Sequence, residues 1–161
     1  MTTSAVYPSL RDRVVFITGG ASGIGAAIVE QFCEQGAKVS FVDIDATASE
    51  ALADSIADRN LPRPRFIACD LKDITALQNA IGQVITSDGP ITALINNAAN
   101  DQRHTLDEVT PEYFDDRIAV NLRHHFFTTQ AVHGPMAEAG GGAIVNIGSV
   151  TWLIGQGGMP C

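Results

Sequence analysis

The segment TGGASGIG, residues 18–25, decides the fold. It follows a run of apolar and β-branched residues, Arg13–Thr18 (RVVFIT), which predicts a short buried strand. It also opens a stretch with helical spacing, Ser22–Gln35, which Gly36 closes. The apolar and neighbouring residues that fall on or near one face of this predicted helix are Ile24, Ala27, Ile28, Gln31 and Phe32.

The three spaced glycines of this segment each have a physical reason. Gly19 lets the chain turn sharply out of the strand, Gly23 lets backbone approach a pyrophosphate, and Gly25 lets the helix pack against the sheet. The free N–H groups and the dipole of the helix N-terminus would then face the phosphates. A tight turn that binds no ligand is the alternative interpretation. The strand before the loop and the helix after it favour the nucleotide site.

Outward from this loop, short apolar runs alternate with amphipathic stretches. Uniformly apolar strands between helices indicate a parallel sheet covered on both faces, and right-handed crossovers make it doubly wound. We therefore expect one α/β domain over residues 1–161, a three-layer Rossmann-like fold with strand order 3-2-1-4-5. The further strands are predicted at Lys38–Val42, Arg65–Cys69, Ile91–Ile95 and Ala143–Ile147, and the further helices at Ala46–Arg59, Asp73–Thr86 and Pro111 to about Ala139.

The last of these helices has marked ends and a marked interruption. Thr110 is the predicted N-cap with Pro111 at the first helical position. Gly134 and Pro135 are expected to kink or weaken the helix.

Composition limits the classes of function. The chain carries a net charge of −8, and such acidity disfavours binding to nucleic acids and to anionic membranes. No apolar run approaches the roughly 18 residues of a membrane span. The cysteines Cys33, Cys69 and Cys161 form neither a disulfide framework nor a zinc signature, which fits a cytoplasmic protein. No metal site is expected, because the adjacent His124 and His125 would point about 100° apart on a helix.

Asp43 ends the second predicted strand. A carboxylate at this place can accept hydrogen bonds from the hydroxyls of an adenosine ribose, and it would repel a 2′-phosphate. The expected cofactor is therefore NAD rather than NADP.

Motifs along almost the whole chain resemble those of classical short-chain dehydrogenases/reductases. The glycine segment is similar to the family's Thr-Gly-x-x-x-Gly-x-Gly motif, and residues 96–99 (NNAA) are similar to its Asn-Asn-Ala-Gly, with Ala99 in place of glycine. Asn121 and Ser149 match the active-site Asn and catalytic Ser of the family. The residues that the resemblance implies for the cofactor are Gly19, Ser22, Gly23, Ile24, Gly25, Asp43, Ile44, Asp70, Leu71, Asn97, Ala98, Ala99 and Val120.

The resemblance also implies the kind of substrate. The segments at residues 7–10 (YPSL), 100–104 (NDQRH) and 121–124 (NLRH) are similar to those of sugar dehydrogenases of this family, NAD-dependent D-xylose 1-dehydrogenases among them. A small sugar or secondary alcohol is the expected substrate, with Arg103, His104 and Trp152 as its contacts. Packing is the equal alternative for Trp152.

The family's general base is a Tyr in a Tyr-x-x-x-Lys pair, and these residues do not contain it. Tyr7 and Tyr113 are followed four positions on by Arg11 and Arg117, and the family's Tyr would fall directly after Cys161. We expect an interrupted copy of the enzyme that is inactive alone. The alternatives are a non-catalytic NAD-binding module and a non-functional gene product.

The resemblance further implies a homo-dimer or homo-tetramer for the complete protein. In the family, the long helix usually contributes to the contact between subunits. We expect its apolar residues around Phe126 and Phe127 to be partly exposed.

Overall fold

The structure is a computed structural model that describes residues 5–155, 157 and 158. Its five-stranded parallel sheet has the order β3-β2-β1-β4-β5, which confirms the predicted doubly wound topology. The strands are β1 (Val14–Thr18), β2 (Lys38–Asp43), β3 (Arg65–Ala68), β4 (Ala93–Asn96) and β5 (Ala143–Asn146). The helical elements are η1 (Pro8–Leu10), α1 (Gly23–Glu34), α2 (Ala46–Asp58), α3 (Ile74–Asp88), η2 (Leu106–Glu108), α4 (Pro111–Ile118), η3 (Ala119–Arg123), α5 (His124–Glu138) and α6 (Thr151–Ile154).

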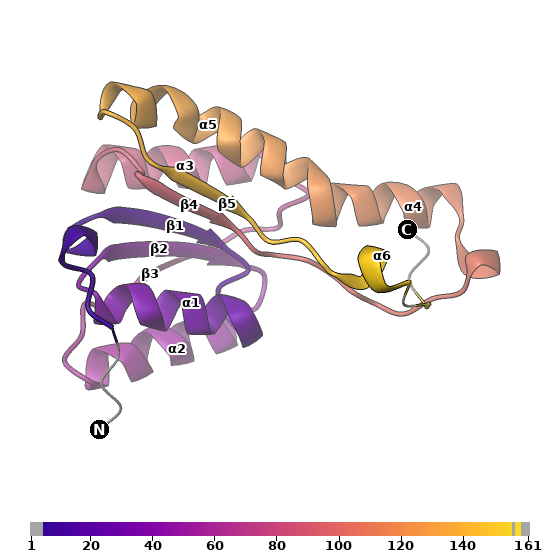
Figure 1. Cartoon of the computed structure of the whole chain (residues 1–161), viewed down its shortest axis with the longest axis horizontal. Helices are drawn as coiled ribbons and strands as arrows, with labels where there is room; N and C mark the ends of the chain where they lie inside the picture. Colours follow the sequence, from indigo (N-terminus) through magenta and orange to yellow (C-terminus); the bar gives the residue numbers. More distant parts are fainter. Residues whose placement is uncertain (1–4, 156, 159–161) are drawn as a thin grey trace.

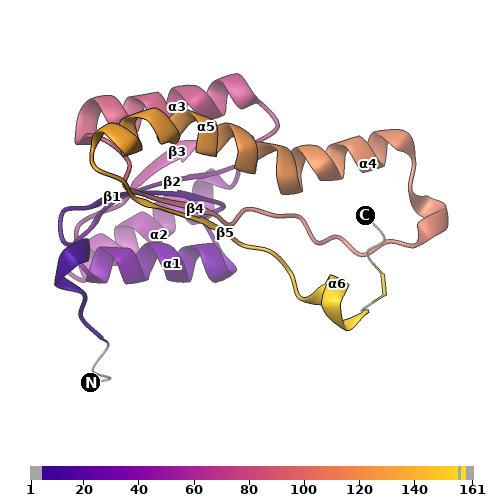
Figure 2. The same ribbon diagram turned by 45° about the horizontal axis from the view of Figure 1, so that its top comes forward.

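The helices cover the sheet from both sides. Helices α1 and α2 lie against one face, and α3 and α5 lie against the other (Figures 1 and 2). Side chains of β1 alternate between these layers, since Phe16 joins the apolar cluster with α3 and α5 while Ile17 joins the cluster with α1. Both side chains are fully buried, so β1 is the centre of the core.

The inner face of α1 differs from the predicted one. The buried residues are Gly25, Val29 and Cys33, whereas Ile24 is 66% exposed. The prediction was therefore right for Ile28 and Phe32, which are partly buried and pack against the core, and wrong for Ile24, Ala27 and Gln31, which are exposed. In the structure the glycine faces the sheet, where only a residue without a side chain fits.

The long predicted helix also differs in detail. It consists of α4, a π-helical segment η3 and α5, and α5 continues through Gly134 and Pro135 to Glu138. A π-helical irregularity that the sequence did not predict lies about three turns before Gly134, at η3. Helix α5 can continue through Pro135 partly because the residue before it is glycine. A proline clashes with the Cβ of the preceding residue, and Gly134 has no Cβ.

The edge of the sheet at β5 is open. All four residues of β5 are exposed, and Val145 is 45% exposed. Beyond the sheet, α4 and α6 extend outward past the ends of the strands (Figures 1 and 2). Among the described residues, no helix has both the length and the apolar character needed to cross a membrane.

Leu94 lies fully buried in the middle of β4 and tests how much the core depends on this strand. We expect Leu94→Ala to lower the free energy of unfolding by about 2–5 kcal/mol, measured by urea denaturation, because it leaves a cavity between the sheet and its helices. The matched control is Leu106→Ala, since Leu106 is 75% exposed, and it is expected to change stability by less than about 0.5 kcal/mol. Equal effects at both positions would contradict this description of the core.

Candidate functional site

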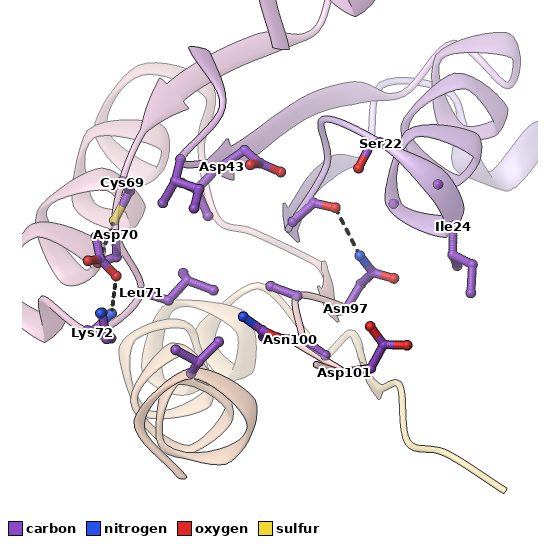
Figure 3. Close-up of a pocket in the computed structure, with 18 of the residues that line it drawn as sticks. Ser22, Ile24, Asp43, Cys69, Asp70, Leu71, Lys72, Asn97, Asn100 and Asp101 are labelled. Carbon is purple, nitrogen blue, oxygen red and sulfur yellow. Dashed lines mark hydrogen bonds between the residues drawn. The ribbon is translucent and has the colours of Figure 1, made fainter. Parts of the chain in front are cut away.

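A cavity of about 720 Å³ opens where the carboxyl ends of β1, β2, β3 and β4 meet. This is the edge of a doubly wound sheet at which ligands bind. Every residue that the sequence predicts for the cofactor lines it. Figure 3 shows Asp43, Asp70, Leu71 and Asn97 around the same space, although they come from different strand ends.

The N-terminus of α1 faces this cavity without a side-chain cap. Ser22 is the N-cap residue, but its side chain accepts no hydrogen bond from the helix, and no acidic residue lies in the first turn. By contrast, α2, α3 and α4 are capped by Asp45, Asp73 and Thr110. The free N–H groups and the positive end of the α1 dipole are therefore available to an anion.

Two glycines make this helix end accessible. A Cβ on Gly25 would lie 1.8 Å from the carbonyl oxygen of Gly19, so the helix reaches the loop only because this side chain is absent. Gly23 has a φ of +55°, and a Cβ there would meet nothing within 4 Å. The space in front of Gly23 is thus open toward the cavity, where a ligand can contact the backbone directly.

Asp43 is held in place by backbone N–H groups. Its Oδ2 accepts a hydrogen bond from the Ala21 amide at 2.9 Å, and its Oδ1 accepts one from the Asp45 amide at 3.1 Å. Each carboxylate oxygen keeps a second lone pair. The fixed carboxylate can therefore accept hydrogen bonds from two neighbouring hydroxyls of a ligand.

The segment after β3 supplies a second fixed carboxylate. Asp70 Oδ1 accepts from the Lys72 amide at 2.9 Å, and the Lys72 ammonium pairs with Asp116 at 3.2 Å. Asp116 also pairs with Arg117, and the hydrogen bonds from Arg117 and Lys72 lower the pKa of the Asp116 carboxyl. Both cations that line the cavity are thus engaged by the same carboxylate.

The turn after β4 is tied to the end of β1. The Thr18 hydroxyl accepts hydrogen bonds from the amides of Asn97 at 3.0 Å and Ala98 at 3.1 Å. The Asn97 side chain donates to the carbonyls of Thr18 at 3.2 Å and Gly19 at 2.9 Å. These bonds fix the position of the cavity wall next to the glycine-rich loop.

The predicted catalytic residues lie outside the cavity lining. The Asn121 amide is held by the backbone of Asn100, accepting from its N–H at 2.7 Å and donating to its carbonyl at 3.1 Å. Ser149 is exposed after β5, and its Oγ contacts Thr151 Oγ1 at 2.9 Å. No hydrogen bond of the described residues joins Asn121 to Ser149.

The predicted substrate contacts lie in different surroundings. Arg103 is exposed, whereas His104 is only 8% exposed and its Nδ1 contacts the Gln102 carbonyl at 2.9 Å and the Tyr113 hydroxyl at 3.1 Å. The side chain of Trp152 lies outside the described part of the chain.

Sequence reasoning missed several residues that line the cavity. Asn100 and Asp101 directly follow the β4 turn, and Asp116 and Arg117 precede Val120 by one helical turn. Helical spacing from Val120 was therefore a usable signal. Within the described residues, no cluster of three or more His, Cys, Asp or Glu side chains could hold a metal ion.

Residues 13–161 match the protein family described as short chain dehydrogenase. The chain is 46% identical over 157 residues to the probable galactose dehydrogenase GalD of Rhizobium meliloti, covering 98% of this chain and 61% of that protein. It is also 46% identical over 153 residues to the D-xylose 1-dehydrogenase of Caulobacter vibrioides, covering 95% of this chain and 60% of that protein.

A solved structure agrees with these matches. The crystal structure of gox2181 superposes with a TM-score of 0.84 at 28% identity, covering 92% of this chain and 59% of that chain. The chain thus spans about 60% of the length of these two curated relatives.

The contact between α1 and the loop can be tested with one substitution. We expect Gly25→Ala to lower the free energy of unfolding by about 1–3 kcal/mol in chemical denaturation, because the new methyl group overlaps the Gly19 carbonyl. The control is Gly82→Ala in α3, where a Cβ meets nothing within 4 Å, and it should stabilise the chain by up to about 1 kcal/mol. A Gly25→Ala variant as stable as the wild type would refute the close approach.

Proposed function

The chain belongs to the short-chain dehydrogenase family, and we propose that its 161 residues form one nucleotide-binding domain that binds NAD in the cavity at the strand ends. The observation that carries this proposal is the position of the predicted cofactor residues. They come from four strand ends and two helices, and all of them line one cavity.

The groups that line the cavity match the pyrophosphate, the adenosine ribose and the adenine of NAD. The uncapped N-terminus of α1 would hold the pyrophosphate. Asp43 would accept the hydroxyls of the adenosine ribose, and Asp70 with Leu71 would contact the adenine. Val120, in η3, and Asn97, after β4, would line the same space from two sides. When bound, NAD supplies an acceptor for a hydride.

Charge favours NAD over NADP. A 2′-phosphate would stand beside the Asp43 carboxylate, and like charges at such a distance repel. The cations that line the cavity, Lys72 and Arg117, both pair with Asp116.

We propose that the reaction is the oxidation of a sugar or a secondary alcohol. Galactose and D-xylose dehydrogenases are among the relatives, and both names denote sugar oxidation. In a protein that joins this chain to the Tyr-x-x-x-Lys pair of the family, Ser149 would hydrogen-bond the reacting oxygen and Asn121 would hold a water molecule near the Lys. Arg103, His104 and Trp152 are proposed as contacts of the sugar.

The surface of the long helical stretch supports an assembly of identical subunits. Phe114, Ile118, Leu122 and Phe126 recur at four-residue spacing, and each is exposed, Phe126 by 63%. We propose that this apolar stripe belongs to the contact of a homo-dimer or homo-tetramer.

We further propose a cytoplasmic location, because the described cysteines Cys33 and Cys69 are buried thiols without a disulfide.

Isothermal titration calorimetry of the chain with NAD and NADP tests the nucleotide site. We expect NAD to bind more tightly than NADP, and Asp43→Asn to weaken NAD binding about 10-fold while narrowing the preference over NADP. Asp58→Asn, at the exposed end of α2, is the matched control and should leave both affinities unchanged. A folded chain that binds neither nucleotide would contradict the proposal.

An activity assay separates binding from catalysis. The 161 residues, mixed with NAD and D-xylose or D-galactose, are expected to form no NADH, because they contain no Tyr-x-x-x-Lys pair to act as general base. The Caulobacter vibrioides D-xylose 1-dehydrogenase serves as the positive control in the same assay. Formation of NADH by these residues alone would mean that another group is the base.

A further inference from the structure

His124 is a fully buried histidine that the proposed site does not use. It is the first residue of α5, its exposed fraction is 0%, and it lies behind the cavity wall rather than on it. Its Nε2 is 3.4 Å from the hydroxyl oxygen of Thr18. This is the hydroxyl that holds the turn after β4.

The other hydrogen bonds of Thr18 determine whether Thr18 or His124 is the donor in this contact. The hydroxyl oxygen has two lone pairs, and both are taken by the amides of Asn97 and Ala98. The hydroxyl proton must therefore point to an acceptor. His124 Nε2 is the remaining polar partner of this oxygen among the described residues, so Thr18 donates and His124 accepts.

The acceptor role fixes the protonation state of the ring. A neutral imidazole that accepts at Nε2 carries its proton on Nδ1. Nδ1 is buried without a hydrogen-bond partner of good geometry among the described residues. The backbone of Val120 acts on the imidazole and raises its pKa, against the larger effect of burial. Val120 lies in the π-helical segment η3, one turn before His124.

The surroundings keep His124 uncharged at neutral pH. Burial lowers the pKa of the His124 imidazole to about 4, and the adjacent His125, whose ring centroid is 4.3 Å away, lowers it as well. The strands β1 and β4 carry no ionisable side chain, α3 carries only Asp88, and Arg123 of η3 donates to the Lys72 carbonyl. No carboxylate from these elements stabilises an imidazolium.

We propose that His124 is a positioning residue of the nucleotide site: as a neutral acceptor, it holds the Thr18 hydroxyl in the orientation that lets Thr18 bind both amides of the β4 turn. This inference rests on the proposed function for its effect on NAD. With a donor at Nε2, Thr18 would lose its acceptor and could keep only one of the two amide hydrogen bonds. The turn at Asn97 and Ala98 would then loosen, and both residues line the cavity.

The first experiment needs no nucleotide. Nitrogen-15 NMR of the imidazole in the wild-type chain reports which ring nitrogen carries the proton. We expect a neutral ring with the proton on Nδ1 at neutral pH. A proton on Nε2, or a cationic ring, would overturn the proposal whether or not the chain binds NAD.

The second experiment compares two substitutions of His124, one that keeps a hydrogen-bond acceptor for Thr18 and one that removes it. His124→Gln keeps an oxygen that can accept from Thr18, whereas His124→Phe keeps a ring without an acceptor. We expect amide hydrogen exchange at Asn97 and Ala98 to quicken about 10-fold in His124→Phe and to stay near the wild-type rate in His124→Gln. His125→Gln, the same change at the next residue, is the control and should leave this exchange unchanged.

NAD titration of the same variants connects positioning to binding. We expect His124→Phe to weaken NAD binding on the order of 10-fold and His124→Gln to restore it to within about threefold of the wild type. Equal losses in both variants would mean that His124 acts by packing and would overturn the proposal. If the wild-type chain binds no NAD, the proposed function fails, while the NMR and exchange measurements still decide the role of His124 at the β4 turn.

Discussion

The close contact between the glycine-rich loop and the turn after β4 is the constraint on which the site depends. A Cβ on Gly19 would lie 2.7 Å from the Cα of Ala98, so the two segments touch through their backbones. The parallel register pairs Thr18 with Asn96 and brings the loop and the turn side by side. A slip of one residue would turn Thr18 to the other face of the sheet and break its bonds to the turn. The floor of the cavity therefore follows from strand register.

The π-helical segment η3 adapts the long helix to this floor. A π-turn contains about one residue more than an α-turn, which rotates the following residues by about 100° relative to a regular helix. In this chain Val120 faces the cavity, Asn121 bonds the backbone of Asn100, and His124 is buried against Thr18. The irregularity thus lies where the helix passes the site, and the regular α5 that follows packs on β4 and α3.

The sequence predicts the parts of the site that lie next to strand ends. Asp43, Asp70 and Asn97 follow apolar strands directly, so topology alone brings them to one edge. The residues contributed by α4, such as Arg117, depend on how that helix crosses the sheet, which periodicity does not specify. The burial of His124 depends on η3, and a π-turn leaves no pattern in the sequence. The inner face of α1 was predictable in principle, because the requirement that Gly25 face the sheet forces Ile24 outward.

The charges of the cavity then define the orientation of an anionic ligand. Acidic groups predominate in the lining, yet Asp43 and Asp70 are each held by backbone N–H groups, and Asp116 is balanced by Lys72 and Arg117. The N-terminus of α1 also lines the cavity, and no side chain caps its N–H groups. A phosphate group is therefore stabilised at that end and repelled near Asp43, where neutral hydroxyls are the better ligands. If the chain binds NAD as proposed, this one distribution of charge would set the direction in which the dinucleotide lies and would also disfavour a further phosphate on its ribose.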